Sequence, residues 1–536
     1  MKRFLLGFLV LGLALAGCQE KEPVQTVAGP KLVSCDPSDG ARDLVGGALT
    51  ITMIFDRSIK CLPDGKAKIS VDGEASIRDV TASTNKLEIG VLGLKQGETY
   101  TVTVPEGTVL GYGSNQKPAE EISITFSMKH VEPYVPSDPG SMKPLVNPNA
   151  SKETKLVYNF LQEQSGKKTL SGAQSSHSHK NDFVDFIYNN IGEHPALAGY
   201  DFLFLQFSPT PSNWNWVQNY NDISAPREQW ASGGLVSYMW HWNVPDSKEA
   251  WDNGVKNYNF DGYAFYTSDT SFDIREALKP GTWQNDFIMK DIQEVAGYLQ
   301  LLEDENIPVL WRPLHEAAGN YDVYGSNGAW FWWGSQGAEP CKQLWRLLYD
   351  QLVNVHGLDN LIWVWTVDVT KGAEDQYLDW YPGDEYVDIL GVDIYAQDVE
   401  AKTRQYEALV DMTGGEKLVA ISECGNIPDP AKCMEAGNKW SWFMVWCTTD
   451  SNGNLALNNT DWSYNTLEHW NNVMGSPYVL NREDMPSFII PSTTHCHSEC
   501  PTIIPSEPFR VPHCHSERPF PSAPLSFRAS EASRGI

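Results

Sequence analysis

Two glutamates stand just after short apolar runs of the sequence, where strands of a sheet would end. Glu316 follows the run 308–311, and Glu423 follows the run 417–421. A single carboxylate in such a place is as often an ion-pair partner as a functional group. Two together suit hydrolysis of a glycosidic bond, in which one acid protonates the leaving oxygen and one carboxylate acts on the other face of the sugar. We therefore expect Glu316 and Glu423 to be the catalytic pair.

The elements that must position this pair alternate between apolar runs and amphipathic segments over residues 151–476. The eight runs are 169–173, 196–199, 235–240, 308–311, 361–365, 387–392, 417–421 and 442–446. This alternation predicts an α/β fold, a (β/α)₈ TIM barrel, whose chemistry sits at the carboxyl ends of the strands. A doubly wound open sheet is the alternative, but no glycine-rich phosphate loop follows the first run.

Three motifs in this region resemble glycoside hydrolase family 26. They are residues 311–316 (Trp-Arg-Pro-Leu-His-Glu), 330–334 (Trp-Phe-Trp-Trp-Gly) and 391–395 (Gly-Val-Asp-Ile-Tyr). The resemblance covers about residues 151–476 and implies an endo-β-1,4-mannanase that hydrolyses mannan, glucomannan or galactomannan with retention. A β-glucanase or a β-xylanase is the alternative within the same family.

The resemblance implies that Glu316 is the general acid/base and Glu423 the nucleophile. It also implies substrate-site roles for a set of residues at other strand ends: His241, His315, Trp330, Asp393, Tyr395 and Trp446. Among these, Tyr395 would donate a hydrogen bond to the nucleophile, with Asp393 supporting that arrangement. Two of them have plain structural alternatives, because His315 could be a buried barrel histidine and Asp393 a strand-end cap.

The same resemblance places aromatic and imidazole side chains around the sugar. Trp446 would be the platform at the cleavage point, with Trp442 as a competitor, and Trp330 would stack on the leaving-group side. His241 would contact the sugar on the non-reducing side, and His315 would help to bind and orient it. Residues 320–329 intervene between the first two motifs as an added loop, which weakens the aromatic correspondence there.

Retention sets further expectations for the pair. The two carboxyl groups should lie about 5–5.5 Å apart. The acid must be protonated at neutral pH, and both the charge of Glu423 and a tryptophan-rich wall would raise the pKa of Glu316. The chemistry requires no metal and no cofactor.

The first residues resemble a bacterial lipoprotein signal. Lys2 and Arg3 precede the apolar run 4–16, which has the length of a signal-peptide core, and Leu-Ala-Gly-Cys ends at Cys18. We expect Cys18 to carry the lipid anchor, and 1–18 to be the signal ending in that cysteine. The mature protein would then be anchored to the bacterial outer membrane at the cell surface, with the periplasmic face as the alternative.

Residues 31–128 alternate apolar and polar side chains over short runs separated by turns. This pattern predicts an all-β immunoglobulin-like sandwich, which would act as a spacer, with sugar binding as the alternative role. Residues 19–30 read as a polar tether and 129–150 as a proline-rich linker. Cys35 and Cys61 could pair within the sandwich.

The last segment, 477–536, is rich in proline and serine and is expected to be a disordered tail. The string His-Cys-His-Ser-Glu occurs at 495–499 and again at 513–517. These residues could bind zinc in principle, but their spacing matches no standard zinc module.

The formal net charge is −28, which disfavours nucleic acid and polyanionic glycans as partners. A neutral substrate fits better, such as the mannan polysaccharide or oligosaccharide that the resemblance implies, and we expect a monomer. The 20 tryptophans suit either a core filled with aromatic rings or a cleft lined by sugar-stacking rings. The alternative from another class is a non-catalytic surface lipoprotein that captures glycans and would tolerate loss of either glutamate.

Overall fold

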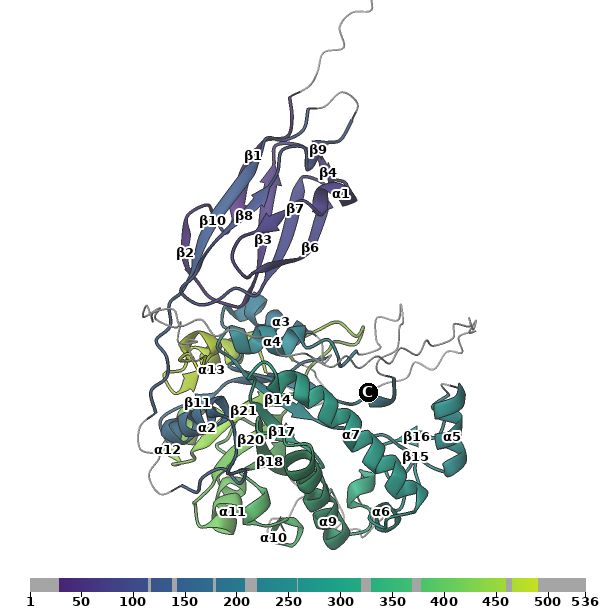
Figure 1. Ribbon diagram of the computed structural model, residues 1–536. Helices are drawn as coiled ribbons and strands as arrows, with labels where there is room; N and C mark the ends of the chain where they lie inside the picture. Colours follow the sequence, from purple (N-terminus) through teal and green to yellow (C-terminus); the bar gives the residue numbers. More distant parts are fainter. Residues whose placement is uncertain are drawn as a thin grey trace, which may run out of the picture. The chain divides into compact units, whose positions relative to one another are not determined.

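The computed structural model describes residues 28–113, 117–136, 142–176, 180–207, 219–257, 259–319, 329–368, 377–458 and 465–489 (Figure 1). The expected signal with Cys18, most of the added loop, and the two His-Cys-His-Ser-Glu strings lie outside these residues. Within the described part, no helix combines the length and the hydropathy needed to cross a membrane.

The N-terminal part is all-β apart from one short helix. Its elements are β1 (Leu32–Asp36), β2 (Ala41–Leu44), β3 (Ala48–Phe55), β4 (Ile59–Cys61), α1 (Pro63–Lys66), β5 (Ser70–Val71), β6 (Ser76–Ser83), β7 (Lys86–Leu92), β8 (Thr99–Val104), β9 (Val109–Gly111) and β10 (Ile122–Met128). They form one four-stranded sheet in the order β1-β3-β7-β6 and another in the order β2-β10-β8-β5.

Both sheets contribute alternate residues to one apolar core. Ile51 and Ile89 come from the first sheet and Val102 and Phe126 from the second, and each is at most 1 % exposed. The period-two pattern therefore buries one face of each sheet, as a sandwich requires. Cys35 and Cys61 are free thiols, so the disulfide considered from the sequence is absent.

Residues 169–445 form a closed barrel of eight parallel strands, which confirms the predicted TIM barrel and excludes the open doubly wound sheet. The barrel strands are β12 (Gly172–Gln174), β13 (Leu197–Asp201), β14 (Leu235–Met239), β17 (Val309–Arg312), β18 (Leu361–Asp368), β19 (Ile389–Ile394), β20 (Leu418–Cys424) and β21 (Trp440–Val445). They are hydrogen-bonded in this order, and pairing of β12 with β21 closes the ring. Nearby, β11 (Thr169–Leu170) joins β21 to β22 (Val479–Leu480).

Helices alternate with these strands and cover the outside of the barrel (Figure 1). They are α2 (Lys152–Gln164), α3 (Asp182–Ile191), α4 (Ser224–Ala231), α5 (Lys248–Asn257), α6 (Ile274–Ala277), α7 (Trp283–Glu303), α9 (Ala338–Tyr349), α10 (Tyr377–Trp380), α11 (Thr403–Thr413), α12 (Pro430–Glu435) and α13 (Leu467–Met474). The two-stranded ribbon β15 (Val244–Pro245) and β16 (Tyr263–Ala264) lies in the connection between β14 and β17.

Two helices show how the sequence defines their ends. In α7, Thr282 caps the first turn by accepting a hydrogen bond from the Asn285 amide at 3.1 Å. The helix buries the stripe that contains Ile288, Ile292 and Leu299. Helix α9 continues as a π-helical turn (Asp350–Val355) and stops before Gly357, whose φ of 74° suits glycine.

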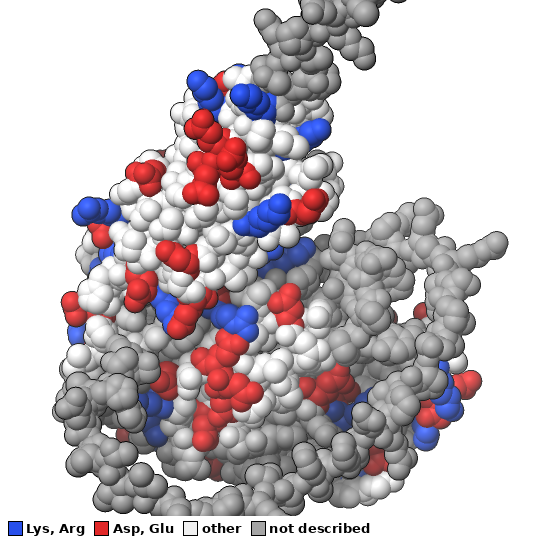
Figure 2. All heavy atoms as spheres, turned by 45° about the horizontal axis from the view of Figure 1, so that its top comes forward, with Lys and Arg blue, Asp and Glu red and all other residues white. Residues whose placement is uncertain are grey.

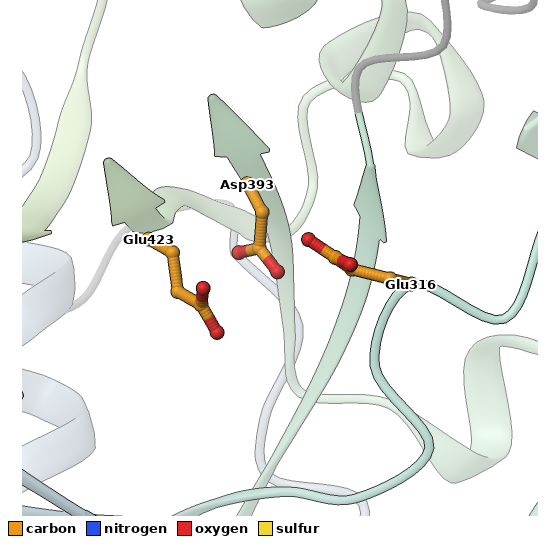
Figure 3. Close-up of side chains that lie close together, drawn as sticks. All are labelled: Glu316, Asp393 and Glu423. Carbon is orange, nitrogen blue, oxygen red and sulfur yellow. The ribbon is translucent and has the colours of Figure 1, made fainter. Parts of the chain in front are cut away.

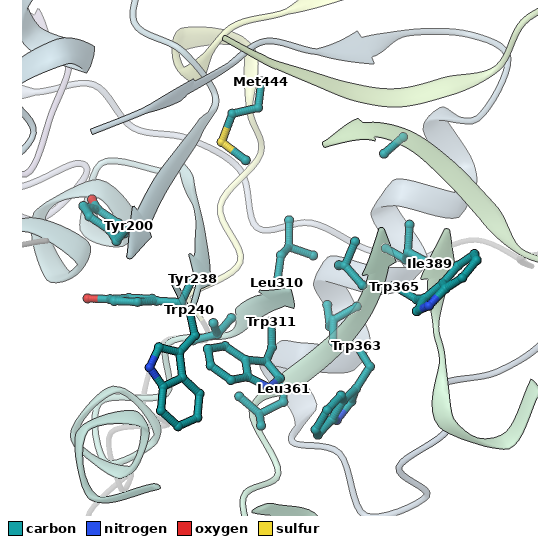
Figure 4. Close-up of a cluster of buried hydrophobic side chains, with 14 of the residues drawn as sticks. Tyr200, Tyr238, Trp240, Leu310, Trp311, Leu361, Trp363, Trp365, Ile389 and Met444 are labelled. Carbon is teal, nitrogen blue, oxygen red and sulfur yellow. The ribbon is translucent and has the colours of Figure 1, made fainter. Parts of the chain in front are cut away.

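Tryptophan fills much of the barrel core (Figure 4). Ten of the 20 tryptophans are among the largest fully buried side chains: Trp240, Trp242, Trp311, Trp332, Trp333, Trp345, Trp363, Trp440, Trp442 and Trp470. Trp240 and Trp242 stack with their ring centroids 3.9 Å apart. Trp230, Trp365 and Trp380 are also buried, so at least thirteen tryptophans serve the core, and those that line a cleft must be sought among the remainder.

Candidate active site

Parallel strands bring four polar side chains together at the carboxyl end of the barrel. Arg312 ends β17 and Asp368 ends β18, while Asp393 and Glu423 lie near the ends of β19 and β20. In the strand register, Asp393 is paired with both Asp368 and Glu423. Because all eight strands run in one direction, these side chains meet at a single mouth.

A bulge in β20 decides which side chain of that strand faces the mouth. The register with β19 shifts between Val392, which pairs with Ile421, and Asp393, which pairs with Glu423. Ser422 is the extra residue, and its hydroxyl lies 3.2 Å from that of Thr366. Bulges commonly re-aim side chains beside active sites. In a regular register without the bulge, Ser422 would take the place beside Asp393.

Glu316 lies in the loop after β17 rather than on a strand. Its φ is 51° and that of Leu314 is 49°, both in the left-handed region that side chains other than glycine rarely adopt. The Glu316 amide donates to the Thr366 carbonyl at 3.1 Å, and the Trp333 indole N–H donates to the His315 carbonyl at 2.9 Å. Neighbouring elements thus hold this strained loop in one conformation.

The carboxyl groups of Glu316, Asp393 and Glu423 point toward one another (Figure 3). One oxygen from each lies within 4.8 Å of the others. The structure therefore brings the two glutamates singled out from the sequence together at one barrel mouth. This is the close spacing that a nucleophile and an acid on opposite sides of one sugar require.

Arg312 holds two of the three carboxyl groups. It is 1 % exposed, donates to Asp393 at 3.0 Å and also donates to Glu423. The Tyr395 hydroxyl donates to the other oxygen of Glu423 at 2.6 Å. Glu423 thus accepts two hydrogen bonds that fix the orientation of its carboxyl group. A divalent cation placed on this trio would lie close to the charge of Arg312, so the residues present do not favour a metal.

Glu316 has the opposite environment. Burial raises its pKa to about 8, and the nearby charge of Glu423 adds to this shift. The Trp330 indole N–H donates to its Oε2 at 2.8 Å. Burial likewise raises the pKa of Asp393. Glu316 is therefore able to carry a proton at neutral pH next to a carboxylate that accepts two hydrogen bonds.

His241 and Trp446 form another wall of the mouth. Their ring centroids lie 6.0 Å apart. Trp446 is partly exposed, whereas Trp442, the alternative candidate for the sugar platform, is buried in the core. Asp201, at the end of β13, accepts hydrogen bonds from both the His241 amide at 3.0 Å and its Nδ1 at 2.6 Å. These bonds fix the ring orientation of His241.

His315 lies behind this wall and is 1 % exposed. Its ring meets that of His241 edge-on at 4.6 Å. Burial lowers the pKa of His315 well below the usual value for histidine, so the ring is neutral. Its position favours an orienting role over direct contact with a sugar.

A cavity of about 520 Å³ opens over the carboxylates. Its lining consists of Tyr266, Glu316, Trp330, Phe331, Asp368, Asp393, Ile394, Tyr395 and Ala396. Of the lining residues, Tyr266, Phe331 and Asp368 were missed from the sequence, as were Arg312 and Asp201 beside it. The sequence could have marked Arg312, Asp368 and Asp201 as site candidates, because each lies at the end of an apolar run. No signal in one sequence separates Tyr266 and Phe331 from core aromatics.

Acidic side chains are spread over the face shown in Figure 2, with basic ones among them, in keeping with the net charge of −28. Carboxyl groups also line the cavity, namely those of Glu316, Asp368 and Asp393, and no basic residue is among its described lining residues. Such a mouth disfavours a polyanionic ligand and accepts a neutral one.

Comparison with known proteins gives one family. The sequence profile of glycosyl hydrolase family 26 matches residues 146–484. A mannan endo-1,4-beta-mannosidase of Thermothelomyces thermophilus is 36 % identical over 347 residues, which is 64 % of this chain and 63 % of that protein. The matched part thus spans less than two thirds of this relative, and it spans 51 % of a Piromyces relative of the same kind.

Two solved structures share the fold. The family 26 domain of an endo-beta-mannanase/endo-beta-glucanase from Prevotella bryantii has a TM-score of 0.55 and 33 % identity, covering 64 % of this chain and 99 % of that domain. A beta-mannanase from a symbiotic protist of the termite Reticulitermes speratus, complexed with gluco-manno-oligosaccharide, has a TM-score of 0.53 and 32 % identity, covering 66 % and 99 %.

Proposed function

The chain belongs to glycosyl hydrolase family 26, and from this premise we propose that it is an endo-β-1,4-mannanase that retains the anomeric configuration. The observation that carries the proposal is the trio of carboxyl groups of Glu316, Asp393 and Glu423. One oxygen from each lies within 4.8 Å of the others, although the two glutamates come from separate parts of the chain. Such proximity suits direct attack of a carboxylate on the sugar, as in a retaining enzyme.

In the first step, a carboxylate oxygen of Glu423 attacks the anomeric carbon of the mannosyl unit. The bond between that carbon and the glycosidic oxygen breaks, and the proton of Glu316 passes to the leaving oxygen. Arg312 and Tyr395 hold Glu423 in place for the attack. A covalent glycosyl-enzyme results.

In the second step, Glu316 acts as a base. Esterified Glu423 carries no charge, so the electrostatic contribution that raised the pKa of Glu316 disappears. Glu316 takes a proton from water, the water oxygen attacks the anomeric carbon, and the Glu423 carboxylate leaves. Two inversions give net retention.

The substrate assignment follows the mannanase relatives, and a direct assay tests it. Purified enzyme should release reducing ends from galactomannan and glucomannan much faster than from mixed-linkage glucan or xylan. Proton NMR of the first products should show the β-anomer before mutarotation. No reducing ends from any mannan, or an α-anomer as first product, would refute the proposal.

The environment of Glu316 predicts the alkaline limb of the pH profile. Since the acid must be protonated, kcat/KM on mannan should be lost as the pH rises through about 8, where the Glu316 carboxyl loses its proton. The charge of Asp368 is a further cause of the raised pKa of Glu316. Asp368→Asn should therefore move this limb to lower pH, and a limb that stays in place would contradict this electrostatic account.

The N-terminal region suggests where the enzyme works. We propose that Cys18 is acylated and that the sandwich is an immunoglobulin-like spacer between the anchor and the barrel. This rests on the Leu-Ala-Gly-Cys motif and on two sheets that share one core. Cys18→Ala should move mannanase activity from the membrane fraction to the soluble fraction. An unchanged distribution would contradict the proposed lipid anchor at Cys18.

A further inference from the structure

Thr366, near the end of β18, contacts the segments that carry both glutamates. Its carbonyl accepts a hydrogen bond from the Glu316 amide at 3.1 Å, and its hydroxyl donates to the Ser422 hydroxyl at 3.2 Å. Ser422 directly precedes Glu423 in the bulge of β20. Both hydroxyl residues are buried, Thr366 being 2 % and Ser422 0 % exposed. One residue of a barrel strand therefore touches the loop of the acid and the bulge of the nucleophile.

The two hydroxyls meet across β19, which lies between β18 and β20 in the barrel. Gly391 pairs with Thr366 in the strand register and leaves the room for this contact. A Cβ atom on Gly391 would lie 1.9 Å from the Ser422 Oγ and 2.8 Å from the Thr366 Oγ1. Both distances are too short for a real contact, so any side chain at this position would push the hydroxyls apart.

The bulge gives β20 two consecutive side chains on one face of the sheet. In a regular strand, neighbouring residues point to opposite faces. Glu423 is paired with Asp393, which lies two residues after Gly391 and therefore on the same face of β19. Ser422 also lies on this face, because its Oγ approaches the side-chain position of Gly391. A bulge leaves its extra residue outside the ladder, and the hydrogen bond to Thr366 holds that residue in place.

Both hydroxyls lie deeper in the barrel than the cavity. Thr366 comes two residues before Asp368 on β18, so it is farther from the mouth. Asp368 and Asp393 line the catalytic cavity, whereas neither Thr366 nor Ser422 is among its described lining residues. A substrate in the cavity would meet the carboxyl groups and not these hydroxyls. Any effect of the hydroxyls on the reaction must therefore pass through the positions of the two glutamates.

We propose that Thr366 is a positioning residue that sets the separation between the carboxyl groups of Glu316 and Glu423, with Ser422 as its partner. This inference rests on the proposed function. The first step needs both carboxyl groups placed on one sugar unit, and a displacement of about 1 Å can cost about a hundredfold in rate. The Thr366 carbonyl fixes the loop of the acid and its hydroxyl fixes the bulge of the nucleophile, so one strand limits the movement of both.

The test removes the hydroxyl contact from either side. In Thr366→Val and in Ser422→Ala, kcat on galactomannan should fall about 10-fold to 100-fold. KM should stay at the parent's value, because substrate binding does not use these hydroxyls. The double variant should be no slower than the slower single variant, since both changes break the same hydrogen bond. Thr366→Ser keeps the hydroxyl and should retain the parent's kcat.

An aryl β-mannoside shows which glutamate the hydroxyl contact positions. The first step on this substrate needs attack by Glu423 but no proton from Glu316, because a nitrophenolate departs unaided. In Thr366→Val, kcat/KM on the aryl substrate should therefore fall by the same factor as on galactomannan. A loss confined to galactomannan would assign the effect to the acid alone and would overturn the proposed role of the hydroxyl.

Ser237→Ala is the matched control. The buried Ser237 hydroxyl donates to the Leu310 carbonyl at 3.0 Å and joins β14 to β17 of the same barrel without involving either glutamate. The control should lower the melting temperature about as much as Thr366→Val or Ser422→Ala but keep the parent's kcat, and either of those variants suffices if the other does not fold. An unchanged kcat in both, or an equal loss in the control, would overturn the positioning role alone. A parent that cleaves no mannan would overturn the proposed function itself.

Discussion

The Glu423→Ala variant should lose nearly all turnover of mannan, with kcat reduced by about 10⁴-fold or more, as in other enzymes deprived of a covalent nucleophile. Without this carboxylate, no group at the mouth can form the glycosyl-enzyme. The alanine also leaves Arg312 and Tyr395 without their shared acceptor. Initial rates on galactomannan, measured with enzyme of verified fold, give the comparison.

Two controls define what this loss means. Azide is small enough to occupy the space of the missing carboxylate, and with an activated aryl β-mannoside it should restore turnover and give the α-mannosyl azide. Binding of mannan, followed by affinity electrophoresis, should persist in the variant. Product release equal to that of the parent would remove Glu423 from the mechanism and favour a protein that only captures glycans.

The Glu316→Ala variant should lose about 10²–10⁴-fold in kcat/KM on mannan, the usual contribution of a general acid. The loss should depend on the leaving group, because a nitrophenolate needs no proton to depart. With an aryl β-mannoside, the first step should therefore stay fast, and the glycosyl-enzyme should accumulate because no base activates water for the second step.

The measurement is a pre-steady-state burst of nitrophenol followed by slow turnover, with the intermediate seen by mass spectrometry as a sugar attached to Glu423. Trp330→Phe is the matched control, since it removes the hydrogen bond to Glu316 but leaves the carboxyl group. It should slow mannan cleavage far less and show no burst. An equal loss on mannan and on the aryl substrate would contradict the role of Glu316 as acid.

Much of this protein follows from its sequence alone. The eight apolar runs marked the barrel strands because strands buried on both faces read as continuous apolar stretches. Parallel strands then send every strand end to one rim, so Glu316 and Glu423 could be placed at one mouth without coordinates. The resemblance to family 26, carried by three local motifs, was confirmed by the family profile.

Tertiary structure decided the rest, because it depends on contacts between segments far apart in the chain. The bulge that turns Glu423 inward arises from the register between β19 and β20. Arg312 reaches Asp393 and Glu423 only because three strands meet, and at least thirteen of the tryptophans proved to be core. Strand ends can be read from local pattern, whereas the direction of a side chain, its burial and its partners are set by packing that one sequence does not encode locally.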